Sequence, residues 1–230
     1  MYKEQIKNLL QPFSFFKNMS DEEMDAIVDI SGTRKLAKDS HIFMQDEPLS
    51  NVYFIYDGQV KIYRTDLQGK EQIVNILKEG DLFPHLGFFR KTNYPANALV
   101  TEDVTLIYIP IHLFEQFLFT HPQAAMKVIR LLGDKIFDLQ NRLEEKILHN
   151  TYEQIILLFI RLAKSHGKLI DHERTVLLSS LTNQELANMI GSSRETISRT
   201  LSQLKKKYLI QTNEKGQMII YIERFKEELF

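Results

Sequence analysis

The sequence predicts an α+β protein with an N-terminal β jelly-roll (cupin-like) barrel, a long dimerisation helix and a C-terminal winged helix-turn-helix. Three observations support this order. Short strands with glycine-marked turns fill residues 33–110, one long helical pattern follows, and two short capped helices precede a hairpin near the C-terminus. We expect a barrel domain with flanking helices over 1–120, the long helix over 121–149 and the winged helix over 150–230.

The composition is that of a soluble globular protein, and 230 residues suffice for one or two domains. A net charge of −1 means that any nucleic-acid site must be local rather than a property of the whole surface. The absence of cysteine excludes disulfides, iron–sulfur clusters and thiol redox sensing. No run of about 18 apolar residues and no signal-peptide core occur, so we expect a cytoplasmic protein without a membrane partner.

The first 110 residues combine two helices with a strand-rich segment. A stripe of Ile6, Leu9 and Leu10 predicts one helix, and Ser20 with Glu23 forms a capping-box pattern for a second. The β-branched and aromatic runs that predict strands are 52–56, 60–63, 72–77 and 104–109. The turn signals between them are Asp57-Gly58, Gln68-Gly69, Glu79-Gly80 and Asn93-Tyr94-Pro95. Such a barrel either encloses a small-ligand cavity or is filled by its own side chains, and the sequence leaves both open.

The long helix carries a narrow apolar stripe. Its members alternate in steps of three and four: Ile129, Leu132, Ile136, Leu139 and Leu143, with Ile147 one turn further. A buried core helix is one interpretation. A two-fold homodimer seam fits a stripe this narrow better. Asn150 with Glu153 caps the next helix, and the junction at His149-Asn150 is a candidate hinge.

Two short helices near the C-terminus are separated by a tight turn. Thr182 with Glu185 predicts the start of the first, and Gly191 ends it. Ser192 with Glu195 predicts a capping box for the second. Beyond them, runs 209–212 and 217–222 flank a turn and predict the wing, and 175–179 predicts another strand.

The second helix has an apolar face and a polar face. Ile197, Leu201 and Leu204 are expected to point inward. The opposite stripe is Arg194, Glu195, Ser198, Arg199 and Ser202. Arginine can read guanine, glutamate can accept from cytosine, and serine lets the helix approach the groove closely. The lysines at 205–207 could reach phosphates. A solvated amphipathic helix is the alternative for such a face taken alone, but two capped helices with a basic end favour DNA binding.

This order of elements resembles the CRP/FNR superfamily of bacterial transcription regulators. The resemblance rests on the run 193–199 (Ser-Arg-Glu-Thr-Ile-Ser-Arg) and on the barrel runs 56–58, Gly69 and 80–89. It implies a homodimer that binds double-stranded DNA at a palindromic promoter site with TGA-containing half-sites and that contacts RNA polymerase. We expect an activator, and repression stays open because the outcome depends on promoter position. The expected DNA-binding residues are Arg194, Glu195, Ser198, Arg199, Thr182, Ser193 and Lys205.

The chain departs from the family where cyclic AMP would bind. The family's glutamate and its Arg-Ser/Thr pair are replaced by Pro84-His85 and Tyr94-Pro95, and its polar pair on the long helix falls at Leu139-Gln140. A cyclic phosphate would meet no cation there, so we expect no cyclic-AMP binding and no resident cofactor or metal. The sequence leaves open whether the protein binds an unidentified small-molecule effector or has no effector at all.

The candidate effector-binding residues are His85, Tyr94, Asn97 and Gln140. His85 could serve as a haem ligand, a pH-sensitive group or an effector contact, or it could be a hydrogen-bonded loop histidine. In the expected mechanism, an event at the barrel shifts the long helices. The hinge near Asn150 then sets the two recognition helices one DNA turn apart.

An enzyme and a ligand-sensing module are the two other classes of function for such a chain. No paired carboxylates, nucleophile elbow, phosphate loop or metal set appears, so we do not expect an enzyme. The alternative to a DNA-binding regulator is a ligand-sensing module that acts through protein contacts without DNA. A steep salt dependence of binding to heparin or random DNA would distinguish the two.

Overall fold

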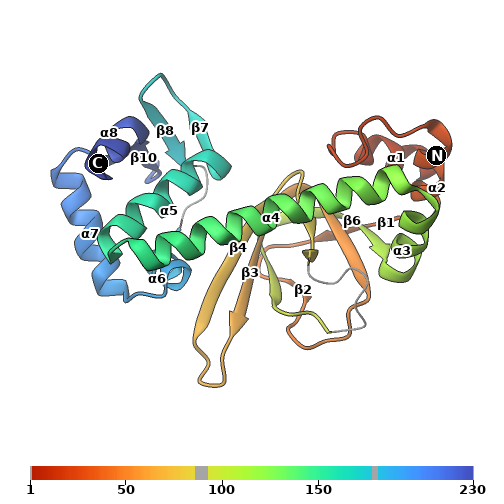
Figure 1. Ribbon diagram of the computed structural model, residues 1–230, viewed down its shortest axis with the longest axis horizontal. Coiled ribbons are helices and arrows are strands. Elements are labelled where there is room, and N and C mark those ends of the chain that lie inside the picture. The colour runs from red at the N-terminus through yellow and green to blue at the C-terminus, as the bar shows by residue number, and fades with distance from the viewer. Residues whose placement is uncertain (1, 86–92, 178–180, 230) are drawn as a thin grey trace. The chain divides into compact units, whose positions relative to one another are not determined.

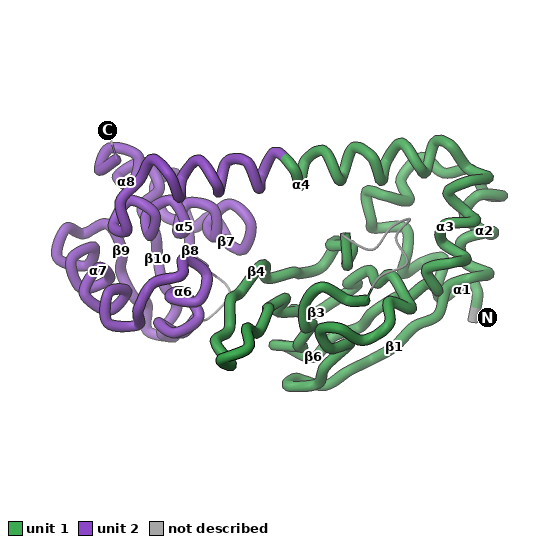
Figure 2. Tube along the Cα trace, turned by 60° about the horizontal axis from the view of Figure 1, so that its bottom comes forward, with its two compact units in different colours: residues 1–136 green, residues 137–230 purple. Residues whose placement is uncertain are grey.

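The computed structural model describes residues 2–85, 93–177 and 181–229. It divides into two compact units, residues 1–136 and 137–230, and the division falls within the long helix α4 (Pro122–Leu148; Figure 2). The α+β class is confirmed: an antiparallel sheet domain is followed by a long helix and a helix-turn-helix domain. Within the described residues, no helix has both the length and the apolar character that a membrane span needs.

The first unit is an antiparallel sheet with helices before and after it (Figure 1). Its elements before α4 are α1 (Tyr2–Leu10), α2 (Asp21–Asp29), β1 (Gly32–Leu36), β2 (His41–Phe43), β3 (Asn51–Thr65), β4 (Glu71–Lys78), β5 (Leu82–Phe83), β6 (Asn97–Pro110) and α3 (Ile111–Thr120). The strands pair in the order β1-β6-β3-β4, with β2 added to β6 and β5 added to β3. The long strands β3 and β6 therefore organise the whole sheet.

Alternation along β3 separates two cores. Val52 and Phe54 pack against the N-terminal helices, α3 and the start of α4, whereas Tyr53 and Ile55 belong to a second cluster inside the sheet domain. Successive side chains of a strand point to opposite faces, so one strand can serve both cores. The jelly-roll interior is therefore lined by residues of strands that the sequence predicts, but the sequence does not show which of these residues face the interior.

The predicted turn at Asp57-Gly58 is wrong. The two runs that it was expected to separate form the single strand β3, whose pairing with β6 shifts register around these residues. Gly58 has φ +92°, and a Cβ there would lie 2.2 Å from the carbonyl oxygen of Asp103. A glycine that accepts positive φ and a close backbone neighbour is typical of a β-bulge, which looks like a turn in sequence.

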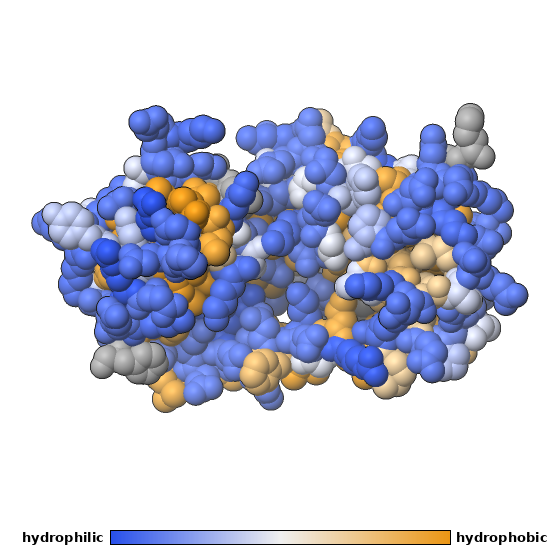
Figure 3. All heavy atoms as spheres, turned by 90° about the horizontal axis from the view of Figure 1, so that it is seen from above, coloured by the Kyte–Doolittle hydropathy of each residue, from blue (hydrophilic) through white to orange (hydrophobic). Residues whose placement is uncertain are grey.

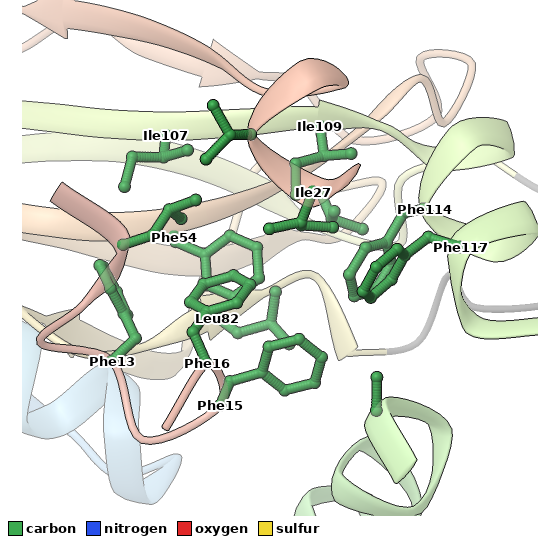
Figure 4. Close-up of a cluster of buried hydrophobic side chains, with 14 of the residues drawn as sticks. Phe13, Phe15, Phe16, Ile27, Phe54, Leu82, Ile107, Ile109, Phe114 and Phe117 are labelled. Carbon is green, nitrogen blue, oxygen red and sulfur yellow. The ribbon is translucent and has the colours of Figure 1, made fainter. Parts of the chain in front are cut away.

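The N-terminal helices are joined to the sheet by an aromatic cluster (Figure 4). Phe16 meets Phe15 and Phe54 at ring-centroid distances of 4.9 Å, and Phe13 lies 5.5 Å from Phe54. Edge-on and tilted contacts of this kind stabilise beyond simple burial. The predicted capping box of Ser20 and Glu23 is confirmed, but the role of residues 13–16 was not predicted.

The second unit contains the C-terminal half of α4 and a winged helix. Its further elements are α5 (Thr151–His166), β7 (Gly167–Leu169), β8 (Arg174–Leu177), α6 (Asn183–Ile190), α7 (Arg194–Lys206), β9 (Ile210–Thr212), β10 (Met218–Tyr221) and α8 (Ile222–Leu229). The strands form one antiparallel sheet in the order β7-β8-β10-β9. The wing is β9 with β10. The last part of the expected strand 175–179 lies outside the described residues.

Candidate nucleic-acid interface

Helices α6 and α7 form the helix-turn-helix. Thr182 and Glu185 make the predicted capping box at the start of α6, with the Thr182 hydroxyl accepting from the Glu185 amide at 3.1 Å. Gly191 ends α6 at φ +74°, and its amide donates to the carbonyl of Ala187 at 2.8 Å. Glycine takes this left-handed conformation without the steric penalty that other residues meet. The turn is therefore built as expected.

The N-cap of α7 is Ser193, and the predicted capping box of Ser192 with Glu195 is wrong. The amide of Ser192 donates to the carbonyl of Ala187 at 3.0 Å, so this residue still belongs to the turn that closes α6. The Ser193 hydroxyl instead accepts from the amide of Thr196 at 3.1 Å. As a result, the Glu195 side chain takes no part in capping and is exposed on the first turn of α7.

The inner face of α7 fixes the direction of the outer one. Ile197, Leu201 and Leu204 are buried as predicted, joined by Thr200, in a core made with α5 and α6. The five residues of the predicted outer stripe are all exposed. A shallow depression on this face is lined by Ser198, Arg199, Ser202, Gln203 and Lys206.

Lys206 belongs to the outer face, whereas the lysine expected among the DNA-binding residues is Lys205. Lys206 follows Arg199 by seven residues and Ser202 by four, so helical spacing could have identified it. Across the described residues, Arg194, Glu195, Arg199 and Lys206 have no ion-pair partner in the chain. Their charges are therefore available to a partner molecule.

Lys207 is placed differently from the two lysines before it. Its ammonium group forms an ion pair with Glu228 of α8 and lies 5.5 Å from the ring centroid of Tyr152. The Tyr152 hydroxyl donates to the same carboxylate at 3.0 Å. The hydrogen bond to Glu228 raises the pKa of Lys207. Lys207 is therefore engaged within the chain, and the expectation that all of 205–207 reach phosphates stays a prediction.

The tip of the wing carries one more exposed cation. The Asn213 side-chain oxygen accepts from the amides of Lys215 and Gln217 at 3.0 and 2.8 Å and so fixes the turn between β9 and β10. Lys215 stands at this turn with an exposed side chain. An asparagine at the start of a turn favours this loop, because its side chain can accept hydrogen bonds from backbone amides of the same turn.

Tyr94, a candidate effector residue, is part of the fold. Its ring is 2% exposed and stacks on Phe43 with a centroid distance of 3.8 Å. Its hydroxyl accepts from the amides of Ser50 and Asn51 at 3.3 and 3.1 Å and donates to the Asn51 carbonyl at 3.3 Å. An effector contact through this hydroxyl would have to replace bonds that close the β2–β3 connection.

Asn97 has a similar structural role. Its side-chain oxygen accepts from the amide of Gln45 at 2.9 Å, and its nitrogen donates to the Tyr63 carbonyl and the Thr65 hydroxyl, both at 3.4 Å. Buried polar groups that are satisfied in this way stabilise a fold. Tyr94 and Asn97 thus hold strands together, a role that their residue types and positions in the sequence do not indicate.

His85 and Gln140 lie in different units. Burial, with a smaller contribution from Lys135, lowers the pKa of His85 to about 4, so the imidazole is neutral near pH 7. The residues that follow His85 in the expected cassette, 86–89, lie outside the described part of the chain. Gln140 is exposed on α4 in the second unit. Within the described residues, no cluster of three or more potential metal ligands occurs.

The stripe along α4 is largely open. Ile129, Ile136, Leu139 and Leu143 are 57–61% exposed, while Leu132 packs partly against the helical core of the first unit. Apolar patches interrupt the otherwise hydrophilic surface in the view of Figure 3. Leucine and isoleucine side chains repeated at this spacing are typical of a helix that pairs with another.

Known proteins share both parts of this architecture. A family model for the cyclic nucleotide-binding domain matches residues 33–121, and one for the Crp-like helix-turn-helix domain matches residues 153–227. The anaerobic regulatory protein of Bacillus subtilis (strain 168) is 25% identical over 205 residues, which cover 88% of this chain and 85% of that protein. The CRP-like cAMP-activated global transcriptional regulator of Mycobacterium tuberculosis (strain ATCC 25618 / H37Rv) is 24% identical over 183 residues, or 80% and 81% of the two chains.

A solved structure shares the fold. FixK2 from Bradyrhizobium japonicum superposes with a TM-score of 0.73 at 20% identity, over 86% of this chain and 96% of that one. The two family models, the curated relatives and this fold agree with the helix-turn-helix and the sheet domain described above. The chain is therefore a member of the CRP/FNR superfamily, whose members are DNA-binding transcription regulators and not enzymes.

Proposed function

We propose that this regulator binds a two-fold symmetric promoter site as a homodimer, with one α7 helix in each of two successive major grooves. The observation that carries the proposal is the outer face of α7, where charged and small polar side chains are exposed together. A major groove admits an α-helix, and its base edges offer a distinct pattern for each base pair. The half-sites should contain a TGA core.

Each part of the α7 face has a separate task. Arg194 and Arg199 would bind guanine edges, and Glu195 would accept from a cytosine amino group. Lys205 and Lys206 would bind phosphates and contribute affinity without sequence preference. The hydroxyls of Thr182 and Ser193 already serve as caps, so these residues would contact phosphates alongside their capping role.

The exposed stripe on α4 supports the homodimer. Burying its isoleucines and leucines against the same stripe of a second chain would remove apolar side chains that are more than half exposed. A two-fold axis along this helix would present two α7 helices to the two half-sites, about 34 Å apart. Contact with RNA polymerase and an activating role remain expectations from the family.

We also propose that the regulator works without cyclic AMP. The described part of the cassette has Pro84, His85 and Tyr94 at positions where the family's nucleotide binders use charged and hydroxyl groups. The buried Tyr94 ring is stacked in the core. A cyclic phosphate would find no charge-assisted contact from these positions. Calorimetric titration with cyclic AMP should give no heat of binding, and micromolar affinity would contradict the proposal.

Band-shift assays with Arg194→Ala and Lys206→Ala test the division of tasks. Arg194→Ala should cost about 1–3 kcal/mol on a symmetric site and relax base preference there. Lys206→Ala should weaken binding to specific and random DNA alike and reduce the salt dependence of log K by about 1. Equal, sequence-independent losses from both variants would contradict the base-reading role of Arg194. Absence of any DNA binding by the wild type would favour a ligand-sensing module.

A further inference from the structure

The junction between α4 and α5 is held by side chains of these two helices, one of which also binds the backbone of α6. The sequence predicted a hinge at His149-Asn150, where α4 ends and α5 begins. All the contacts described below lie within the second compact unit, which begins at Phe137 inside α4. The last turns of α4 therefore belong to the same body as the helix-turn-helix.

Lys146, near the end of α4, connects this helix to α6. Its ammonium group donates to the carbonyl of Ile190 at 3.0 Å and to the side-chain oxygen of Gln154 at 3.2 Å. Ile190 is the last residue of α6, directly before the Gly191 turn that leads into α7. The last carbonyls of a helix lack partners within it and carry partial negative charge, so a lysine there is well placed.

Gln154 completes the connection on the α5 side. Its side-chain nitrogen donates to the His149 carbonyl at 2.7 Å and to the Lys146 carbonyl at 3.4 Å, so it binds both the backbone and the side chain at the end of α4. Glu153 accepts from the Asn150 amide at 3.1 Å and meets the His149 imidazole at 3.0 Å. The junction is therefore bonded on both sides of the predicted hinge.

A partly buried ion pair also joins α4 to α5. Glu145 of α4 pairs with Arg161 of α5, and both side chains are less than a third exposed. Burial lowers the pKa of Arg161 to about 10, which still leaves the guanidinium charged at neutral pH. The two helices share a partly buried ion pair and two hydrogen bonds between Lys146 and Gln154, and α5 also binds His149 in the connection, so they do not swing freely about the peptide between them.

We propose that Lys146 is a positioning residue for DNA recognition. By binding the end of α6, it fixes the helix-turn-helix on the last turns of α4, so that the orientation of α4 determines where α7 points. This inference rests on the proposed DNA-binding homodimer. Its consequence is selectivity for the spacing between half-sites: a regulator with a rigid junction accepts one spacing, whereas a loosened one accepts several.

The test compares affinities of the full-length chain for three DNAs. The first is a symmetric site with the half-site spacing that the wild type selects from random DNA (the selected spacing). The others are the same site with two base pairs inserted and a single half-site. For Lys146→Met, which keeps much of the side chain's length but removes its hydrogen bonds, we expect the preference for the selected spacing to fall about tenfold. Half-site affinity should stay within about twofold of wild type, because the base-reading face is intact. Gln154→Leu should lower the spacing preference in the same direction.

Lys164→Met is the matched control. Lys164 is an exposed lysine of α5 with no ion pair in the described part of the chain, and its substitution should leave the spacing preference unchanged. Affinities are measured at protein concentrations where sedimentation shows a single assembly state. Changes in dimerisation then do not affect the ratio of the affinities for the two spacings. Wild-type spacing preference in both Lys146→Met and Gln154→Leu overturns the proposal. A wild type that binds none of the three DNAs overturns the proposed function itself.

Discussion

Polar side chains on the outer face of α7 and polar side chains inside the sheet domain have opposite roles. Arg194, Glu195 and Arg199 are exposed and, within the described chain, have no ion-pair partner. Tyr94 and Asn97 are nearly inaccessible, and their polar atoms are bonded to other strands and loops. Both sets were candidate binding residues on sequence grounds. The difference teaches that a satisfied, buried polar group stabilises its own fold, whereas an unsatisfied, exposed one is available for recognition.

Acidification should lower the stability of the sheet domain through His85, while it should change the affinity of the folded protein for DNA little through this residue. Because the folded-state pKa of His85 is about 4, below its ordinary value near 6.5, the unfolded chain takes up this proton first as pH falls. The contribution of neutral His85 to the unfolding free energy is therefore complete above about pH 6.5 and is lost as the pH falls toward 4. Between pH 7 and pH 5 this loss amounts to about 2 kcal/mol.

The measurement is urea unfolding followed by circular dichroism at both pH values, with His85→Gln as reference. The wild type should lose more stability than the variant by that amount, and DNA affinity of the folded protein should differ little between them. Equal pH dependence of unfolding in the two proteins would show that the imidazole is not held neutral by burial.

Tyr94→Phe should have an effect of comparable size. It keeps the ring on Phe43 but leaves the amides of Ser50 and Asn51 without their acceptor, at a cost of about 1–3 kcal/mol in unfolding free energy. Affinity for DNA should be unchanged when measured well below the unfolding transition. A variant with wild-type stability and an altered response to cell-extract metabolites would instead make Tyr94 an effector contact.

The smallest effect should follow from removing the partner of Lys207. Glu228→Gln breaks the ion pair and makes one more cation available at the end of α7. DNA affinity at low salt should rise modestly, and the slope of log K against log salt should steepen by about 1. Glu227→Gln, the neighbouring exposed carboxylate of α8, is the control for the loss of charge alone. Identical slopes for the two variants would mean that Lys207 does not reach phosphate.

Local patterns predicted the helices and their caps because the partners lie within four residues of each other. The boxes at Ser20, Asn150 and Thr182 and the inner face of α7 were all foreseen in this way. Ser192 was mistaken for the cap of α7, because its role depends on a hydrogen bond back to Ala187 that the residue types do not reveal.

The roles of Tyr94, Asn97 and Lys207 depend on partners 21 to 52 residues away in the chain. Residue type gives no signal for such distant pairing, so the sequence does not reveal these structural roles. The bulge at Gly58 was missed for a similar reason, since its close neighbour is Asp103 on another strand.

Selection of bound sites from random double-stranded DNA tests the central claim most directly. The wild-type chain should enrich an inverted repeat of TGA-containing half-sites with centres about one helical turn apart. Arg194→Ala should enrich sites with weaker base preference within each half. Recovery of no enriched sequence, or of one without two-fold symmetry, would contradict recognition by a pair of α7 helices.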